Sequence, residues 1–178
     1  RHVCNLVKDA KSAHIVEWGP LAGGKRKIRE MWYQDGRWRV ETPEAVTIAD
    51  ANRLWVYSPE RKSVRVSTLD HPFMGGNGFK MTSMLTNQAP GSHVTIVEQD
   101  GYKVVRMENG IDHGHITVWV DKNTDYPVRG QMQSETPHGP KTNGEFTCEF
   151  NVPLPAQKFA AAFTPETKVI DSVGGERC

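Results

Sequence analysis

The chain has 178 residues, of which 37% are hydrophobic and 24% charged, a balance typical of a globular domain and not of a disordered segment. Its 22 basic and 21 acidic residues give a formal net charge of +1, so there is no overall attraction to nucleic acid or anionic membrane. No apolar run approaches the roughly 18–20 residues that span a bilayer. We expect a single domain over residues 1–178.

The chain opens Arg-His-Val-Cys, without Met, and is interpreted as a mature form or a fragment whose targeting signal is out of view. Residues 172–178 are expected to be a flexible tail. The cysteines, Cys4, Cys148 and Cys178, lack metal-binding spacing. A Cys4–Cys148 disulfide and a buried free Cys148 both remain open.

The first predicted element is the end of an amphipathic helix over residues 2–13. Val3, Leu6, Val7 and Ala10 recur there at helical spacing, which would place them on one side of the helix. The helix is expected to lead directly into the first strand.

Short alternating runs then follow one another, most of them separated by tight turns. Asp-Gly pairs at 35–36 and 100–101, each between two alternating runs, are the strongest short-range signal for a β-hairpin. Such a series predicts a mainly antiparallel meander, and so many strands must curl or close to protect their edges and apolar face. The predicted strands are 12–18, 25–33, 37–41, 45–49, 53–58, 63–69, 93–99, 102–108, 115–120, 126–135 and 144–150.

Two segments interrupt the alternation. Residues 71–91 combine a glycine-rich entry with Phe79, Met81, Met84 and Leu85, a pattern that favours a short helical lid. Proline-rich residues 151–171 predict a short helical turn and then a last extended segment. The predicted fold class is therefore mainly β (α+β): a strongly curved antiparallel sheet forming a half-open barrel, with an N-terminal helix and a mid-chain lid.

A search for catalytic chemistry finds little. His113 and His115 would leave the same face of a strand beside Asp112, a possible metal half-site, but nothing in the sequence places a third ligand nearby. There is no nucleophile motif, and the glycines at 75–78 lack the Gly-Lys-Ser/Thr of a phosphate loop. We expect no enzyme, metal or cofactor; a small enzyme using the two histidines is the alternative.

Aromatic and methionine side chains are the remaining candidates. In "WYQDGRWRVE" (32–41), Arg37 and Arg39 alternate with Trp38, so rings and arginines are expected on opposite faces, which argues against a stacking platform for nucleic acid. Large rings on a curved sheet below a Met-rich segment would leave an apolar cavity. Its predicted lining residues are Trp18, Trp32, Trp38, Trp55, Met74, Phe79, Met81, Met84 and Leu85.

Three stretches resemble the LolA/LolB-like superfamily. They are the Trp-Tyr and Arg-Val-Glu of residues 32–41, "IADANRLWVYSPERKSVRV" (48–66) and "KFAAAFTPETKVID" (158–171). That superfamily includes periplasmic lipoprotein carriers, the sensor domains of RseB-type regulators and mycobacterial lipid-binding lipoproteins. The resemblance covers nearly the whole chain and implies a half-open barrel with helices at its mouth.

From the resemblance and the aromatic pattern we expect a periplasmic or otherwise extracytoplasmic binding protein. It would shelter the acyl chains of a lipid or lipoprotein in a hydrophobic cavity, and ligand would displace the lid. The alternative is the sensor domain of a membrane-anchored envelope regulator, which would bind a protein partner. No nucleic-acid partner is expected.

Overall fold

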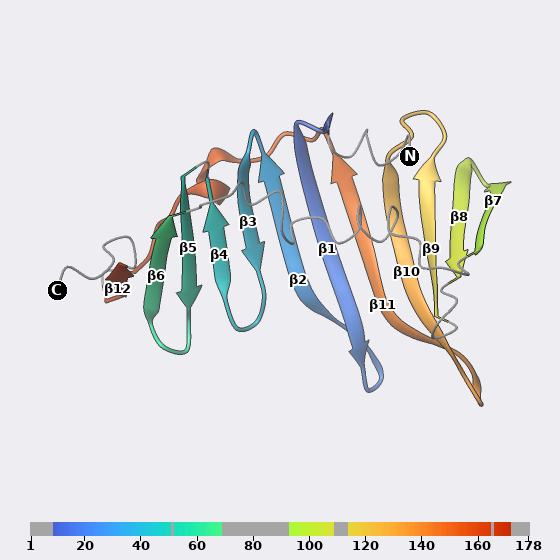
Figure 1. Cartoon of the computed structure of the whole chain (residues 1–178), viewed down its shortest axis with the longest axis horizontal. Helices are drawn as coiled ribbons and strands as arrows, with labels where there is room; N and C mark the ends of the chain where they lie inside the picture. The colour runs from blue at the N-terminus through green and yellow to red at the C-terminus, as the bar shows by residue number, and fades with distance from the viewer. Residues whose placement is uncertain (1–8, 51, 69–92, 109–113, 165, 172–178) are drawn as a thin grey trace.

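A computed structural model describes residues 9–50, 52–68, 93–108, 114–164 and 166–171, and nearly all of their regular structure belongs to one twelve-stranded sheet (Figure 1). The elements are β1 (Ser12–Leu21), β2 (Gly24–Gln34), β3 (Arg37–Glu41), β4 (Val46–Ala49), β5 (Arg53–Ser58), β6 (Ser63–Thr68), β7 (His93–Gln99), β8 (Tyr102–Glu108), β9 (His115–Asp121), β10 (Pro127–Thr136), β11 (Gly139–Phe150), the 3₁₀ helix η2 (Ala156–Phe159) and β12 (Lys168–Asp171).

The strand order places β1 and β11 next to each other near the centre of the sheet. It runs β12-β6-β5-β4-β3-β2-β1-β11-β10-β9-β8-β7, so β1 lies beside β11, with Ile15 opposite Cys148. The chain moves outward from β1 to β6 on one side, and returns inward from β7 to β11 on the other (Figure 1). The predicted meander therefore exists as two halves joined along the β1–β11 pair.

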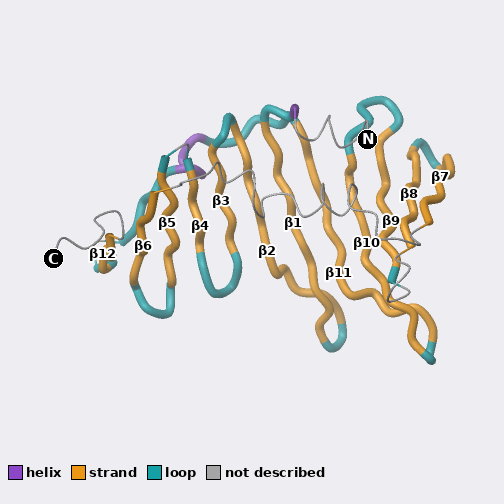
Figure 2. Tube along the Cα trace, in the orientation of Figure 1, coloured by secondary structure: helices purple, strands orange, loops and turns teal. Residues whose placement is uncertain are grey.

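The sheet is mixed and does not close, whereas the prediction was an antiparallel sheet forming a half-open barrel. β12 pairs with β6 in parallel, with Lys168 N donating to Lys62 O at 2.9 Å, whereas the other neighbouring strands are antiparallel. Parallel pairing is possible here because β6 and β12 are not joined by a tight turn. Among the described strands β7 and β12 are the two edges, so the sheet does not close (Figure 2).

The two Asp-Gly hairpins are confirmed. Asp35 and Gly36 have φ of 50° and 78°, and Asp100 and Gly101 have φ of 48° and 83°. Two consecutive residues with positive φ are the signature of a type I′ turn, whose twist matches that of the flanking strands. These turns fix the pairing of β2 with β3 and of β7 with β8.

The predicted helices are wrong in part or lie outside the described residues. The helix expected over 2–13 is wrong at its end, because Ser12 and Ala13 pair with β2 and Ser12 Oγ donates to Val152 O at 2.6 Å. Residues 1–8 and the lid expected over 71–91 lie outside the described residues. The turn and final strand expected within 151–171 are present as η2 and β12. No helix in the described ranges is long and apolar enough to cross a membrane.

β1 and β11 extend furthest beyond their predicted bounds. β1 continues through Pro20 to Leu21, and β11 begins at Gly139, immediately after a two-residue turn. Gly139 has a φ of 101°, and Thr136 Oγ1 donates to its carbonyl oxygen at 2.7 Å. Glycine permits this backbone conformation, so a tight turn forms where the sequence showed only a polar stretch.

Candidate apolar binding face

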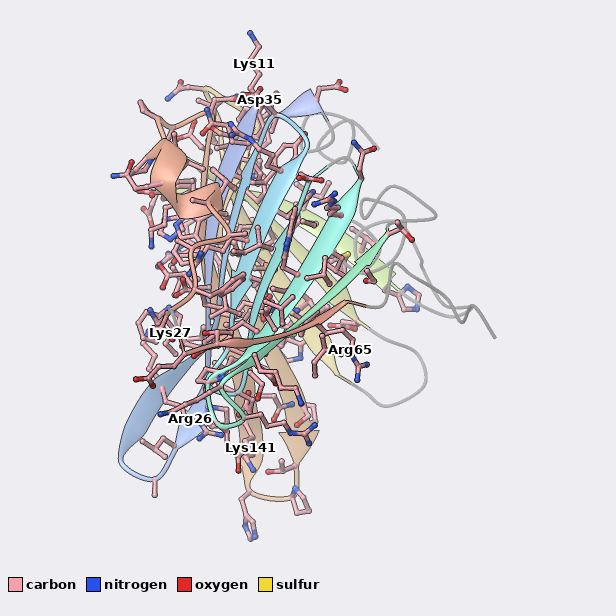
Figure 3. All side chains as sticks on the ribbon, turned by 90° about the vertical axis from the view of Figure 1, so that its left-hand side faces the viewer. Lys11, Arg26, Lys27, Asp35, Arg65 and Lys141 are labelled. Atoms are coloured by element: carbon pink, nitrogen blue, oxygen red, sulfur yellow. The ribbon has the colours of Figure 1, made fainter. Side chains whose placement is uncertain are left out.

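The register divides the sheet into two faces that differ in chemistry, since directly paired residues point to the same side. We call the side that carries Ile15, Met31, Val118 and Phe146 the apolar face, and the other side the opposite face. In the edge-on view, Arg65 extends to one side of the sheet, whereas Lys27 and η2 lie on the other side, which is the opposite face (Figure 3).

A continuous hydrophobic cluster occupies the apolar face. Its members come from six strands on both sides of the β1–β11 pair, and strand alternation places all of them on this one side. The buried members are Ile15, Met31, Met107, Val118, Val120, Phe146 and Cys148, and the partly buried members packed against them are Val40, Val105, Ile116 and Phe150. The partly buried members form the accessible part of the cluster.

The ring of Phe146 lies close against the backbone of β10 at Gly130. Its cross-strand partner is Gly130, and a Cβ added there would lie 2.1 Å from Cζ of the phenyl ring. No side chain other than hydrogen fits this contact without a shift of the ring. Gly130 therefore allows the apolar cluster to continue from β11 across β10 to Val118 on β9.

An ion pair borders the cluster on the same face. Arg29 Nε donates to Glu17 Oε2 at 3.0 Å and its Nη2 to Glu17 Oε1 at 2.5 Å, and both side chains are partly buried. Glu17 is also the cross-strand neighbour of Phe146. The two-point geometry fixes both side chains next to the phenyl ring.

Cys148 is a free, buried cysteine within the cluster. Its Sγ donates to Pro127 O at 3.1 Å, and burial raises the pKa of the thiol to about 12. A thiol protonated at neutral pH is a poor nucleophile, so Cys148 acts here as a core side chain. Of the two alternatives left open by the sequence, the structure shows the free thiol.

Trp32 lies on the opposite face and is enclosed by polar groups. It is 4% exposed, stacks on the His14 ring at 5.5 Å, and has Lys158 Nζ 4.0 Å from its ring centroid. Arg39, its cross-strand partner, donates from Nη1 to Lys158 O at 3.3 Å. The C-terminal segment, residues 152–164, thus covers Trp32 with a cation, which makes this a poor place for an acyl chain.

Charge pairs surround the same position. His14 Nε2 lies 2.9 Å from Glu30 Oε1, and Lys27 Nζ also donates to Glu30. Burial raises the pKa of the Glu30 carboxyl, but the hydrogen bonds from Lys27 and His14 outweigh it and hold the pKa below its ordinary value of 4.5. Glu30 is therefore charged at neutral pH and contributes to a polar layer on the opposite face.

The other predicted tryptophans do not form one group. Trp18 and Trp55 lie on the opposite face with Trp32, because they pair with Glu145 and Ile48, whose side chains point to that face. Trp38 points to the apolar face and packs on Tyr33, with ring centroids 4.6 Å apart. Residues on opposite sides of one sheet cannot line the same cavity. Met74, Phe79, Met81, Met84 and Leu85 lie outside the described residues.

The expectation for the hairpin at 32–41 is confirmed in part. Trp38 does point away from Arg37 and Arg39. However, Trp32 shares a face with Arg39, so the expectation that the rings lie together and apart from the arginines is wrong for Trp32. The reason is the two-residue turn, which pairs residue 32 with 39 and residue 33 with 38.

The proposed histidine half-site is only partly described. His115 is buried on β9, with Nε2 2.7 Å from Gln133 Oε1 and Nδ1 3.7 Å from Glu135 Oε1, whereas His113 lies outside the described residues. Within the described ranges, no group of three histidine, cysteine or carboxylate side chains is arranged to hold a metal ion. The contacts of His115 are those of a buried polar side chain satisfied by its neighbours.

No model of a known protein family matches the sequence, and no curated protein matches it. Solved structures do match the fold. An uncharacterized conserved protein from Thermus thermophilus superposes with a TM-score of 0.54 at 9% identity, over 96% of this chain and 97% of that chain. The likeness therefore extends over nearly the full length of both proteins.

Two further structures are similar at lower scores. A LolA superfamily protein from Nitrosomonas europaea has a TM-score of 0.30 at 12% identity, over 89% of this chain and 97% of that chain. The structure of the Pseudomonas aeruginosa MucA/MucB complex has a TM-score of 0.46 at 13% identity, over 96% of this chain and 64% of that chain. Of these three, only the Thermus thermophilus structure exceeds 0.5, and such low identities speak to fold alone.

Proposed function

We propose that this chain is an extracytoplasmic binding protein that shelters the acyl chains of a lipid or lipidated protein against its apolar face. The observation that carries the proposal is the cluster around Phe146, in which eleven hydrophobic side chains lie on one side of an open sheet. Acyl chains bind through buried apolar area, worth about 0.8 kcal/mol per methylene group. The extracytoplasmic location rests on the resemblance stated above.

The proposed site does not include Trp18, Trp32 or Trp55, which lie on the opposite face. Val40, Val105, Ile116 and Phe150 are partly exposed and border the buried cluster, so they are the side chains that a ligand would contact first. Trp38 lies on the same side. The Arg29–Glu17 pair supplies charged groups at the border, where a lipid headgroup or a polar part of a lipidated partner would lie.

Adjacent residues on β9 provide a matched test. Ile116 points to the apolar face and Thr117 to the opposite face, and both are partly buried. The measurement is binding of a fluorescent fatty acid, 11-dansylaminoundecanoic acid, with circular dichroism to check folding. Ile116→Lys should weaken binding at least tenfold because it places a charge among apolar side chains, whereas Thr117→Lys should change it less than twofold.

Native mass spectrometry of protein purified from cells tests the same proposal without a chosen probe. Bound lipid is expected on the wild-type chain and its loss on Ile116→Lys. A consistently empty wild-type protein that also fails to bind the fatty acid would overturn the acyl-chain proposal. That result would favour the alternative expected from the sequence, a sensor domain that binds a protein partner.

A further inference from the structure

Among the strands that the structure describes, β7 forms one edge of the sheet and pairs with β8 alone. It is hydrogen-bonded to β8 from His93–Glu108 to Gln99–Tyr102, and no strand in the described part of the chain pairs with its other side. A row of backbone N–H and C=O groups therefore faces outward along the strand (Figure 1). Such a row is matched by another extended backbone.

The side chains of β7 are as open as its backbone. All seven residues are exposed, and Val94, Ile96 and Val97 are among the exposed large hydrophobic side chains of the molecule. Val94 and Ile96 extend the apolar face, because they pair with Met107 and Val105. Apolar side chains on an unpaired edge indicate a protein interface.

The two edges of the sheet are protected to different degrees. β12 is four residues long and carries a charged residue at each end. β7 is seven residues long and contains no lysine, arginine or proline. Its one acidic residue, Glu98, already accepts a hydrogen bond from Lys122 Nζ at 2.7 Å. The features that usually prevent edge-to-edge pairing are thus present on β12 and missing on β7.

We propose that β7 pairs antiparallel with β7 of a second copy of this chain, about a two-fold axis at Ile96. In this register Ile96 lies opposite its own counterpart, Thr95 opposite Val97, and Val94 opposite Glu98, so no like charges meet. The edge carries few charges that could attract a charged partner. Its β-branched side chains can instead pack against the same side chains of a second copy. The pairing continues the apolar face from one copy into the next.

The dimer is weak because one strand pair buries little surface. Pairing over seven residues falls below the roughly 1,200 Å² of total buried area that is typical of stable complexes. We expect a dissociation constant on the order of 10–100 μM, so the population of dimer depends on protein concentration.

Sedimentation velocity of the full chain, from about 1 to about 300 μM, tests the proposal. Ile96→Lys should weaken dimerisation at least tenfold. Val169→Lys is the matched control, because Val169 is 63% exposed on β12, against 64% for Ile96 on β7, and it should dimerise like the wild type. Circular dichroism checks that both variants fold. A wild type that stays monomeric throughout, or equal effects of the two variants, would overturn the proposal.

Disulfide trapping tests the register. In a chain with Cys4 and Cys178 replaced by serine, Ile96→Cys should form a disulfide-linked dimer on mild oxidation, since directly opposed Cβ atoms lie within reach of a disulfide. Val97→Cys should react much more slowly, because it lies opposite Thr95. A faster reaction of Val97→Cys contradicts the two-fold axis at Ile96.

Discussion

The two faces of this sheet both bury large side chains, but they do so by different means. On the apolar face, Phe146 lies on the bare backbone at Gly130 and among other hydrocarbon groups. On the opposite face, Trp32 is more deeply buried than Phe146, yet its neighbours are His14 and Lys158. Burial of an aromatic ring therefore does not identify a lipophilic surface; the chemistry of the groups that bury it does.

The largest difference in stability between the two faces is expected when the phenyl ring is removed from the apolar face. Phe146→Ala should lower the free energy of unfolding by about 3–5 kcal/mol, because it deletes a large buried side chain and leaves a cavity. Urea denaturation measures the change. Trp119→Ala, on the opposite face, should cost less than half as much, since Trp119 is partly exposed beneath Arg129. Equal losses would mean that the two faces contribute alike.

A smaller change tests the same contact from the other side. Gly130→Ala should destabilise the fold by about 1–3 kcal/mol, because the new methyl group would overlap the Phe146 ring. Gly24→Ala is the control, since a Cβ at Gly24 meets nothing within 4 Å. If both variants unfold at the same urea concentration, the close approach at Gly130 does not hold the ring.

On the opposite face the expected effect is smaller again. Lys158→Met removes the ammonium over Trp32 but keeps the side-chain length and the carbonyl oxygen that accepts from Arg39. A loss of about 0.5–1 kcal/mol in urea denaturation is expected for a cation–π contact. Lys141→Met, at an exposed position, should leave stability unchanged. No difference between the two lysine variants would show that the ammonium does not stabilise Trp32.

Acid should weaken the polar layer on the opposite face. The pKa of Glu30 is lower in the folded than in the unfolded chain, so unfolded chains take up the proton first as pH falls. The stability that Glu30 contributes is present above its ordinary pKa of 4.5 and is lost as pH falls through the lower, folded value. Glu30→Gln should flatten the dependence of the unfolding free energy on pH between about 5 and 3. An unchanged slope would contradict the role of Lys27 and His14.

Much of the fold follows from local sequence. The segments 37–41, 53–58, 93–99 and 102–108 were predicted with the bounds that the structure shows, because alternation and turn residues are local signals. The pairing of β1 with β11 was not predicted, since it joins residues far apart in the chain. The parallel addition of β12 was missed for the same reason.

The candidate site was harder to predict. The prediction placed all the tryptophans in one cavity. However, side chains alternate along a strand, and the two-residue turn at Asp35-Gly36 pairs residue 33 with 38, so Trp32 and Trp38 must lie on opposite faces. The signal for the apolar face lay in smaller residues, such as Ile116, Val118 and Val120, that recur at alternate positions of one strand. That Lys158 covers Trp32 depends on long-range packing and has no local signal.

The central position of the β1–β11 pair has a consequence for the order of folding. Each half of the sheet is built mostly from neighbouring strands and can form as local hairpins, but His14 and Glu149, which face each other across the central pair, are 135 residues apart in sequence. Closure of so long a loop is entropically costly and slows folding. During synthesis on a ribosome, the edge of β1 that pairs with β11 therefore lacks this partner until Gly139–Phe150 has been made.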